Sequence, residues 1–381
     1  MKKIILFLCL LLLTGCAARE VPEETLPEPT ETTVPVTVPA ALPPETTPPD
    51  PIRLMLNDMS LEERVGQLFL ARCDDNYALE HLEDYHLGGF VLFGRDFTNQ
   101  TPDSFRQKMA SYQNTAKIPL LIAVDEEGGT VTRVSANKAF RAQKFPSPRS
   151  LYNSGGMEAV LLCEKEKCLL LSDLGINVNL APVCDITTDP NAFLYDRSLG
   201  QSPEITSDFI RDTVLEMDSN KIGSCLKHFP GYGNNADTHT GIAIDSRSLE
   251  ALEERDLIPF AAGIQAGADA ILVSHTIVEA LDPDLPASLS PAVHAYLRNH
   301  LGFEGVILTD DLVMQAITDT YGAGEAAVLA VLAGNDLLCS SEYTVQYEAV
   351  LAAVLEGRID IDTLNDAVRR VLQWKIDLGL L

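Results

Sequence analysis

The chain has 381 residues, of which 46% are hydrophobic, and a formal net charge of −27 at pH 7. This length suits one barrel-type domain with additional segments, and the hydrophobic content is enough to form a full core. A nucleic-acid-binding surface needs a basic stripe, and no cluster of Lys and Arg occurs in the sequence. The composition therefore argues against nucleic acid as a partner.

Residues 1–15 have the pattern of a lipoprotein signal peptide. Two lysines precede an apolar run, Ile4–Leu13, which is too short to span a bilayer but has the length of a signal-peptide hydrophobic region. The following LTGC resembles a bacterial lipobox, so cleavage would leave Cys16 as the lipidation site. We expect a lipid anchor on the extracytoplasmic face of the bacterial cell membrane, since several acyl chains give stable anchoring. The alternative is an ordinary cleaved signal peptide with a chance cysteine.

Residues 16–51 read as a linker between this anchor and a folded domain. From Val21 to Pro51 the chain is rich in Pro, Thr and Glu and has no aromatic residue. Such a segment cannot bury a core, and its proline density favours an extended, semi-rigid spacer of about 3.1 Å per residue. The folded domain is therefore expected over residues 52–381.

Short apolar runs alternate with helical patterns throughout residues 52–381. Each run is apolar on both faces, which is typical of strands in a covered parallel sheet. The candidate strands are Gly66–Ala71, Gly89–Phe93, Pro119–Val124, Ile176–Val183, Ile222–Leu226, Ala270–Val273, Val306–Leu308 and Asp336–Leu338. Eight strands alternating with helices predict a single α/β domain of the (β/α)₈ TIM-barrel type, with a doubly wound open sheet as the alternative.

Helix signals and cysteine spacing support this interpretation. Ser60 and Glu63 form a capping-box pattern. Ser290-Pro291 is typical of a helix start, and Gly302 is expected to end that helix. The six cysteines after residue 51 lack metal-type spacing, so they are predicted to be core residues. They are Cys73, Cys163, Cys168, Cys184, Cys225 and Cys339.

Charged side chains follow five of the apolar runs, where a barrel places its catalytic groups. These residues are Asp125, Asp185, Lys227, His228, His275, Asp310 and Asp311. Any one of the aspartates could instead cap the next helix, and this alternative is strongest for Asp185 and Asp311.

The available residue types narrow the chemistry. No GxSxG, HxH or HExxH motif occurs, so a serine nucleophile, a metal and a cofactor are not expected. An improvised metal site of His228, Asp237 and His239 remains an alternative. Carboxylate and imidazole groups are what glycosyl transfer requires: a nucleophile and a proton donor.

Several motifs together resemble the β-N-acetylhexosaminidase branch of glycoside hydrolase family 3. They are KHFPGYGNNADTHT, VDEEGGTVTRV, DRSLG, LPASLS and LRNHLGFEGVILTDDLVM, and the resemblance runs from Met59 to Leu381. It implies a (β/α)₈ barrel and a retaining mechanism through a glycosyl-enzyme intermediate, with a carbohydrate as the substrate.

The resemblance also implies residue roles. Asp310 would be the nucleophile, His239 the acid/base and Asp237 its orienting partner. An imidazole with an ordinary pKa near 6.5 can both give and take a proton at neutral pH. The substrate-binding residues would be Asp125, Arg133, Arg197, Lys227 and His228. His275 is a candidate for a supporting role behind the substrate contacts.

Three positions depart from the family pattern: Tyr232 stands where His is common, Thr130 where Arg is common, and Glu126 where Gln is common. We expect an enzyme that removes terminal β-linked N-acetylglucosamine from peptidoglycan-derived muropeptides. The alternatives are a phosphorylase of the same glycosides, a metal-dependent amidohydrolase and a non-catalytic sugar-binding lipoprotein.

Overall fold

The computed structural model describes residues 50–72, 74–233 and 241–381. The predicted signal peptide, Cys16 and most of the linker lie outside these residues, as do Cys73, Asp237 and His239. Within them, no helix has both the length and the apolar character that a membrane span requires.

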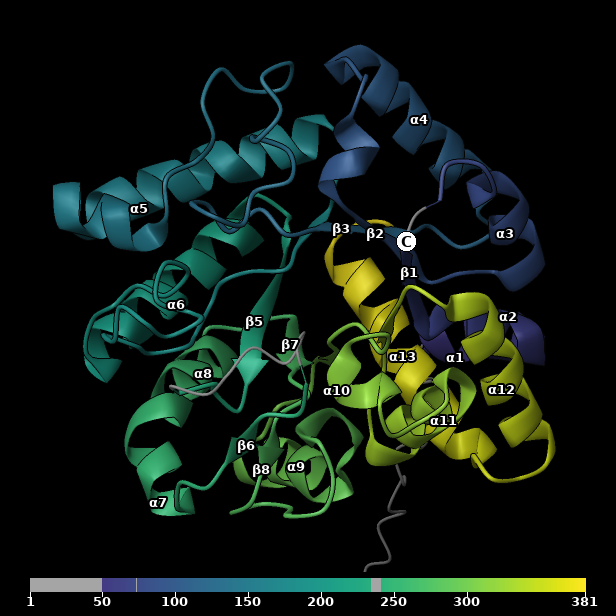
Figure 1. Cartoon of the computed structure of the whole chain (residues 1–381). Helices are drawn as coiled ribbons and strands as arrows, with labels where there is room; N and C mark the ends of the chain where they lie inside the picture. Colours follow the sequence, from purple (N-terminus) through teal and green to yellow (C-terminus); the bar gives the residue numbers. More distant parts are fainter. Residues whose placement is uncertain (1–49, 73, 234–240) are drawn as a thin grey trace, which may run out of the picture. The chain divides into compact units, whose positions relative to one another are not determined.

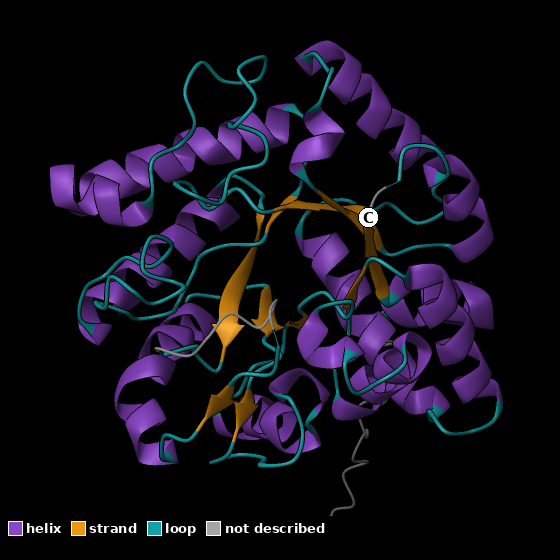
Figure 2. Cartoon of the chain, in the orientation of Figure 1, coloured by secondary structure: helices purple, strands orange, loops and turns teal. Residues whose placement is uncertain are grey.

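Eight parallel strands form the central sheet in the order β10-β1-β2-β3-β4-β5-β7-β9. Their bounds are β1 Phe69–Arg72, β2 Gly89–Leu92, β3 Leu121–Val124, β4 Val178–Asn179, β5 Gly223–Phe229, β7 Ala270–Val273, β9 Val306–Thr309 and β10 Leu338–Ser340. A parallel bridge between Leu308 and Leu337 brings β9 to the start of β10, so the sheet nearly closes into the predicted barrel (Figures 1 and 2). A separate parallel pair, β6 (Ile244–Asp245) and β8 (Ile277–Val278), was not predicted.

Three predicted strand boundaries were wrong in ways that matter for the site. Gly66 belongs to helix α2, so β1 starts later and includes Arg72. β4 ends at Asn179, where the chain approaches Pro182, which has no N–H to donate to a ladder. β5 continues to Phe229, so Lys227 and His228 lie inside the strand and not after it.

Helices surround the barrel (Figure 1). Their bounds are α1 Pro51–Asp58, α2 Leu61–Gln67, α3 Ala78–Tyr85, α4 Pro102–Thr115, α5 Pro148–Asp173, α6 Pro203–Ser219, α7 Leu249–Ala251, α8 Leu257–Gln265, α9 Pro291–Ala295, α10 Gln315–Thr318, α11 Ala323–Ala333, α12 Tyr343–Leu355 and α13 Ile361–Asp377. Short 3₁₀ and π segments are η1 Gly94–Phe97, η3 Leu252–Asp256, η4 Ala287–Leu289 and η5 Tyr296–His300. The predicted capping box of Ser60 and Glu63 is present, as is the Ser290 cap before Pro291.

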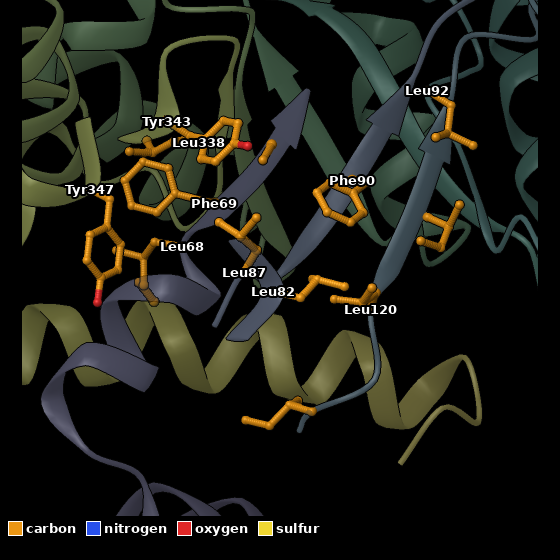
Figure 3. Packing of buried hydrophobic residues seen from close by; sticks show 14 of the residues in the cluster. Leu68, Phe69, Leu82, Leu87, Phe90, Leu92, Leu120, Leu338, Tyr343 and Tyr347 are labelled. Carbon is orange, nitrogen blue, oxygen red and sulfur yellow. The ribbon is translucent and has the colours of Figure 1, made fainter. Parts of the chain in front are cut away.

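The strands alternate between two apolar layers, as barrel strands must. Phe69, Phe90 and Leu92 point outward and pack against the covering helices (Figure 3). Leu70 and Val91 belong to a second cluster with residues from the other strands and Trp374 of α13. The five described cysteines are free and buried, and burial raises the pKa of their thiols, as expected for core residues.

Candidate active site

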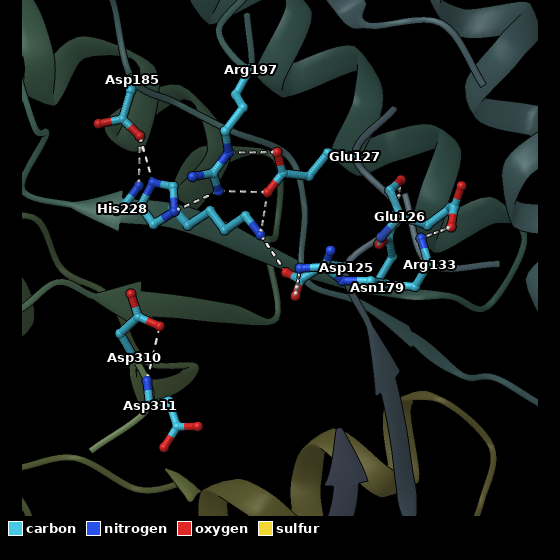
Figure 4. Close-up of polar contacts among 11 residues, drawn as sticks. Asp125, Glu126, Glu127, Arg133, Asn179, Asp185, Arg197, His228, Asp310 and Asp311 are labelled. Atoms are coloured by element: carbon cyan, nitrogen blue, oxygen red, sulfur yellow. Dashed lines mark hydrogen bonds and ion pairs between the residues drawn. The ribbon is translucent and has the colours of Figure 1, made fainter. Parts of the chain in front are cut away.

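A cavity of about 730 Å³ lies where the strands end. Its lining includes all six described residues to which the sequence assigned a catalytic or substrate-binding role: Asp125, Arg133, Arg197, Lys227, His228 and Asp310. These residues come from widely separated parts of the chain, and the barrel brings them to one cavity (Figure 4).

Lys227 stands between two carboxylates. Its Nζ atom lies 2.7 Å from Oδ1 of Asp125 and 2.6 Å from Oε1 of Glu127. The lysine side chain is 2% exposed, so its ammonium group is stabilised by these two acids and not by bulk water. Asp125 is also 3.5 Å from the guanidinium of Arg133.

Glu127 continues this network to Arg197 and His228 (Figure 4). The Nε and Nη2 atoms of Arg197 donate to the two carboxylate oxygens of Glu127, at 2.9 and 2.7 Å. Nη2 of Arg197 also lies 3.0 Å from Nε2 of His228, and Nδ1 of His228 lies 2.8 Å from Oδ2 of Asp185. Because arginine can only donate, Nε2 of His228 accepts this hydrogen bond. The ring proton therefore lies on Nδ1, which donates a hydrogen bond to Asp185.

Asp185 therefore orients the imidazole instead of capping a helix. It also accepts hydrogen bonds from the backbone N–H groups of His228 and Tyr232, at 3.0 and 2.7 Å. In this arrangement the cations and the imidazole hold one another in fixed positions around the cavity.

Electrostatics in the network favour the charged forms. Burial opposes ionisation of Glu127, but Lys227 and Arg197 outweigh it and hold the pKa of that carboxyl well below its usual range. Burial likewise opposes ionisation of Asp125, and Lys227 and then Arg133 lower its pKa overall. Burial lowers the pKa of Lys227, but the two carboxylates reverse the effect and raise it.

The buried Glu126 shapes the loop that presents these acids. One of its carboxylate oxygens accepts backbone N–H bonds from Arg133 and Val134, at 2.8 and 2.7 Å, and Ser135 donates its hydroxyl to the other. Asn179 of β4 accepts the backbone N–H of Glu126 at 2.9 Å. The loop between Asp125 and Arg133 is thus folded around one carboxylate.

Asp310 follows β9 on another wall of the cavity. Its Oδ1 atom accepts the backbone N–H of Asp311 at 2.9 Å. Asp311 also lines the cavity, but its carboxylate accepts hydrogen bonds from Ser341 and from the backbone N–H of Val313. Behind both, His275 lies 3.0 Å from the carbonyl oxygen of Asp311 and 2.7 Å from Oγ of Ser288.

Arg247 connects the residues that precede segment 234–240 with those that follow it. It donates to the carbonyl oxygen of Gly231 at 3.2 Å and forms ion pairs of 2.6 Å with Asp245 and Asp256. Tyr232, next to Gly231, lines the cavity. The chain before this segment therefore lies at the cavity wall, and Arg247 links it to the chain that follows the segment.

Comparison with known proteins gives the same family as the motifs. The family model for the glycosyl hydrolase family 3 N-terminal domain matches residues 60–374. The chain belongs to glycosyl hydrolase family 3. A β-hexosaminidase from Xylella fastidiosa (strain M23) is 33% identical over 78% of this chain and 88% of the relative. One from Stenotrophomonas maltophilia (strain K279a) is 35% identical over 72% of this chain and 84% of the relative.

Solved structures are similar over the barrel. A family 3 β-N-acetylglucosaminidase from Paenibacillus sp. str. FPU-7 superposes with a TM-score of 0.79 at 34% identity, covering 84% of this chain and 63% of that protein. This chain thus spans less than two thirds of the Paenibacillus enzyme. LpqI from M. tuberculosis gives a TM-score of 0.78 at 27% identity, covering 85% of this chain and 96% of that protein. The predicted resemblance to the β-N-acetylhexosaminidase branch is confirmed, and the chain is a glycoside hydrolase of that class.

Sequence reasoning missed the central role of Glu127. Of the three acids after β3, only Asp125 was assigned a role in the site, whereas Glu127 joins Lys227 to Arg197. Asp237 and His239 lie outside the described residues, so their predicted roles and the alternative metal site with His228 stay predictions. Among the described residues, no group of three or more His, Cys, Asp or Glu side chains could hold a metal ion.

Proposed function

We propose that the chain is a retaining β-N-acetylhexosaminidase that hydrolyses terminal β-linked N-acetylglucosamine from peptidoglycan-derived muropeptides. The observation that supports this most is the shared cavity: Asp310 lines it together with the polar network around Lys227 and Glu127. The network pairs each of its cations with a carboxylate, which suits hydrogen bonding to an uncharged sugar.

Asp310 is the proposed nucleophile. Among the described residues, its carboxylate accepts a hydrogen bond only from the N–H of Asp311, so its second oxygen is available to attack the anomeric carbon. The attack displaces the leaving oxygen and forms a glycosyl-enzyme ester, which water then hydrolyses with retention of configuration.

His239 is the proposed acid/base, with Asp237 as its orienting partner. It would protonate the leaving oxygen in the first step and take a proton from water in the second. Both residues belong to the segment between Gly233 and Gly241, which begins two residues after the cavity-lining Tyr232. This supports the assignment, because a segment of seven residues that starts at the cavity wall is long enough to bring His239 to the substrate.

The sugar contacts are assigned to the network residues. Asp125 would accept hydrogen bonds from sugar hydroxyls, and Arg133, Arg197 and Lys227 would donate to hydroxyls or to the N-acetyl carbonyl. His228 would position Arg197 through Nε2. The predicted signal peptide, Cys16 and the linker support an enzyme anchored by lipid to the extracytoplasmic face of the membrane, within reach of the cell wall.

The test compares 4-nitrophenyl β-N-acetylglucosaminide with the β-glucoside, using the purified chain and its Asp310→Asn variant. The proposal expects turnover of the first substrate, little turnover of the second and none with the variant. Products of a muropeptide digest, analysed with and without phosphate, separate hydrolysis from phosphorolysis. Binding without turnover would support a non-catalytic sugar-binding protein, and loss of activity with a chelator would support a metal-dependent enzyme.

A further inference from the structure

Arg72 is a cation of the cavity that neither the motifs nor the network explain. It is the last residue of β1 and lines the same cavity as Asp310. Its guanidinium carbon lies 4.8 Å from the centroid of the Phe93 ring, and its buried Nε atom has no hydrogen-bond partner. Across the described residues, no ion pair or hydrogen bond of this side chain is found.

The other cations of the cavity differ in this respect. Each of them forms an ion pair with a carboxylate. Lys227 pairs with Asp125 and Glu127, Arg197 pairs with Glu127, and Arg133 pairs with Asp125. Within the described part of the chain, Arg72 is thus the cavity-lining Lys or Arg whose charge no carboxylate neutralises directly. A partly buried guanidinium in this state favours an anionic ligand.

The aromatic ring accounts for how the side chain is held. The cation–π contact with the Phe93 ring helps to hold the guanidinium without using its N–H groups. Those groups lie along the edge of the plane and match the two oxygens of a carboxylate. The same ring lies 5.8 Å from the guanidinium carbon of Arg133, whose charge Asp125 already balances.

Strand order places Arg72 across the cavity from Lys227, although the Phe93 ring also brings it near Arg133. In the nearly closed ring, β1 is four strands from β5 in either direction, so Arg72 and Lys227 belong to opposite walls. Only β10 separates β1 from β9, after which Asp310 follows. β9 is likewise two strands from β5, so Asp310 lies between Lys227, which has carboxylate partners, and Arg72, which has none.

We propose that Arg72 binds a carboxylate of the substrate, so that the preferred substrates are N-acetylhexosaminides whose adjoining unit is acidic. This inference rests on the proposed function and assigns a specificity-determining residue to the same cavity. A muropeptide meets the requirement, because its N-acetylmuramic acid unit carries either a free lactyl carboxylate or, where a peptide is attached to that group through an amide bond, the free carboxylates of the peptide. Chitin fragments, which lack any carboxylate, do not.

The test uses a matched pair of substrates: N-acetylglucosaminyl-β-1,4-N-acetylmuramic acid and the methyl ester of its lactyl group. The readout is the ratio of kcat/KM for the acid to that for the ester, so a general change in activity cancels. The full chain should prefer the acid by about tenfold or more, as one charge-assisted contact predicts. Arg72→Gln should bring the ratio near one, and Arg72→Lys should keep part of it. Arg211→Gln, on the exposed face of α6, is the control and should keep the full ratio.

Two results would overturn the inference: a wild-type ratio near one, or a ratio that Arg72→Gln leaves unchanged. Equal losses on both substrates leave the ratio unchanged, and they would indicate that Arg72 acts through Asp310 or through the fold. Calorimetry of N-acetylmuramic acid and its methyl ester binding to each variant reads the same contact without turnover. If the chain hydrolyses no N-acetylhexosaminide but binds N-acetylmuramic acid through Arg72, the proposed function is wrong and the carboxylate contact of Arg72 still holds.

Discussion

The Nζ atom of Lys227 lies 2.6 Å from Oε1 of Glu127, and the same carboxylate receives two hydrogen bonds from Arg197. One buried acid therefore balances two cations that line the cavity. Removing one partner of a buried ion pair leaves an uncompensated charge, which costs more than the pair itself contributes. Glu127 is consequently as important for the cavity as the residues that face the substrate.

Replacing Glu127 with Gln should lower both stability and activity. We expect the free energy of unfolding at pH 7 to fall by about 3–5 kcal/mol, with a lower kcat/KM on 4-nitrophenyl β-N-acetylglucosaminide. Urea denaturation and steady-state kinetics measure the two effects. Glu325→Gln, which removes the exposed pair with Arg358, is the control and should change stability by less than about 1 kcal/mol.

The same variant should change the response to acid. The pKa of Glu127 is lowered in the folded state, so its contribution to stability is complete above the unfolded value near 4.5 and is lost as the pH falls below it. The wild-type chain should therefore lose more stability between pH 6 and pH 3 than Glu127→Gln does. Equal losses would show that Glu127 is not held as a carboxylate by its two partners.

His275 should act as a positioning residue for the nucleophile. Its Nε2 donates to the carbonyl oxygen of Asp311, so Nδ1 accepts from Ser288. We expect His275→Ala to lower kcat about tenfold to a hundredfold, because a small displacement of a reacting group has such an effect. KM should change less, since His275 does not line the cavity. His275→Gln can still offer a donor and should recover part of kcat; no recovery would point to a role in folding alone.

Gly128 should be intolerant of any side chain. Its φ of +104° is a conformation that L-residues rarely adopt, and an added Cβ would lie 2.3 Å from the carbonyl oxygen of Pro146. We expect Gly128→Ala to cost at least about 1–3 kcal/mol through backbone strain and to reduce activity by displacing Glu127. Gly94→Ala, where an added Cβ meets nothing within 4 Å, is the control. Thermal unfolding compares the two, and similar midpoints would contradict the expectation.

The barrel could be predicted because its strands are continuous apolar runs bounded by charged residues. β7 lies where the pattern placed it, and the predicted cavity residues that the structure describes do line one cavity. Individual contacts were less predictable. Glu127 is separated by 70 positions from Arg197, and nothing in a run of three acids says which one turns toward that cation.

Arg72 was not predicted as a site residue because the predicted end of the first strand was one residue too early. The apolar run ends at Ala71, and the predicted strand ended with it, whereas the ladder continues to Arg72 paired with Val91 of β2. Strand length depends on the partner strands, which an apolar pattern does not specify. A charged residue that ends a strand was therefore not counted among the candidates for the site.

Lys375 gives a prediction about stability that is independent of the cavity. Its ammonium group is buried on α13 and donates to Oε1 of Gln67 at 2.6 Å, and burial lowers its pKa to about 7. Below pH 7 the folded state carries a buried charge, which is unfavourable. Between pH 7 and the unfolded value near 10.5, only the unfolded chain holds this proton, so the contribution to the free energy of unfolding rises with pH.

Lys375→Met should remove this pH dependence. Because methionine fills a similar volume without a charge, we expect the variant to be more stable than the wild-type chain by a few kcal/mol at pH 6. The difference should shrink as the pH rises toward 10, since the wild-type lysine is then neutral when folded. Urea denaturation from pH 6 to pH 10 measures this convergence, with Lys221→Met as the control on the exposed turn after α6. Parallel curves for the wild-type chain and Lys375→Met would mean that the buried lysine does not titrate in this range.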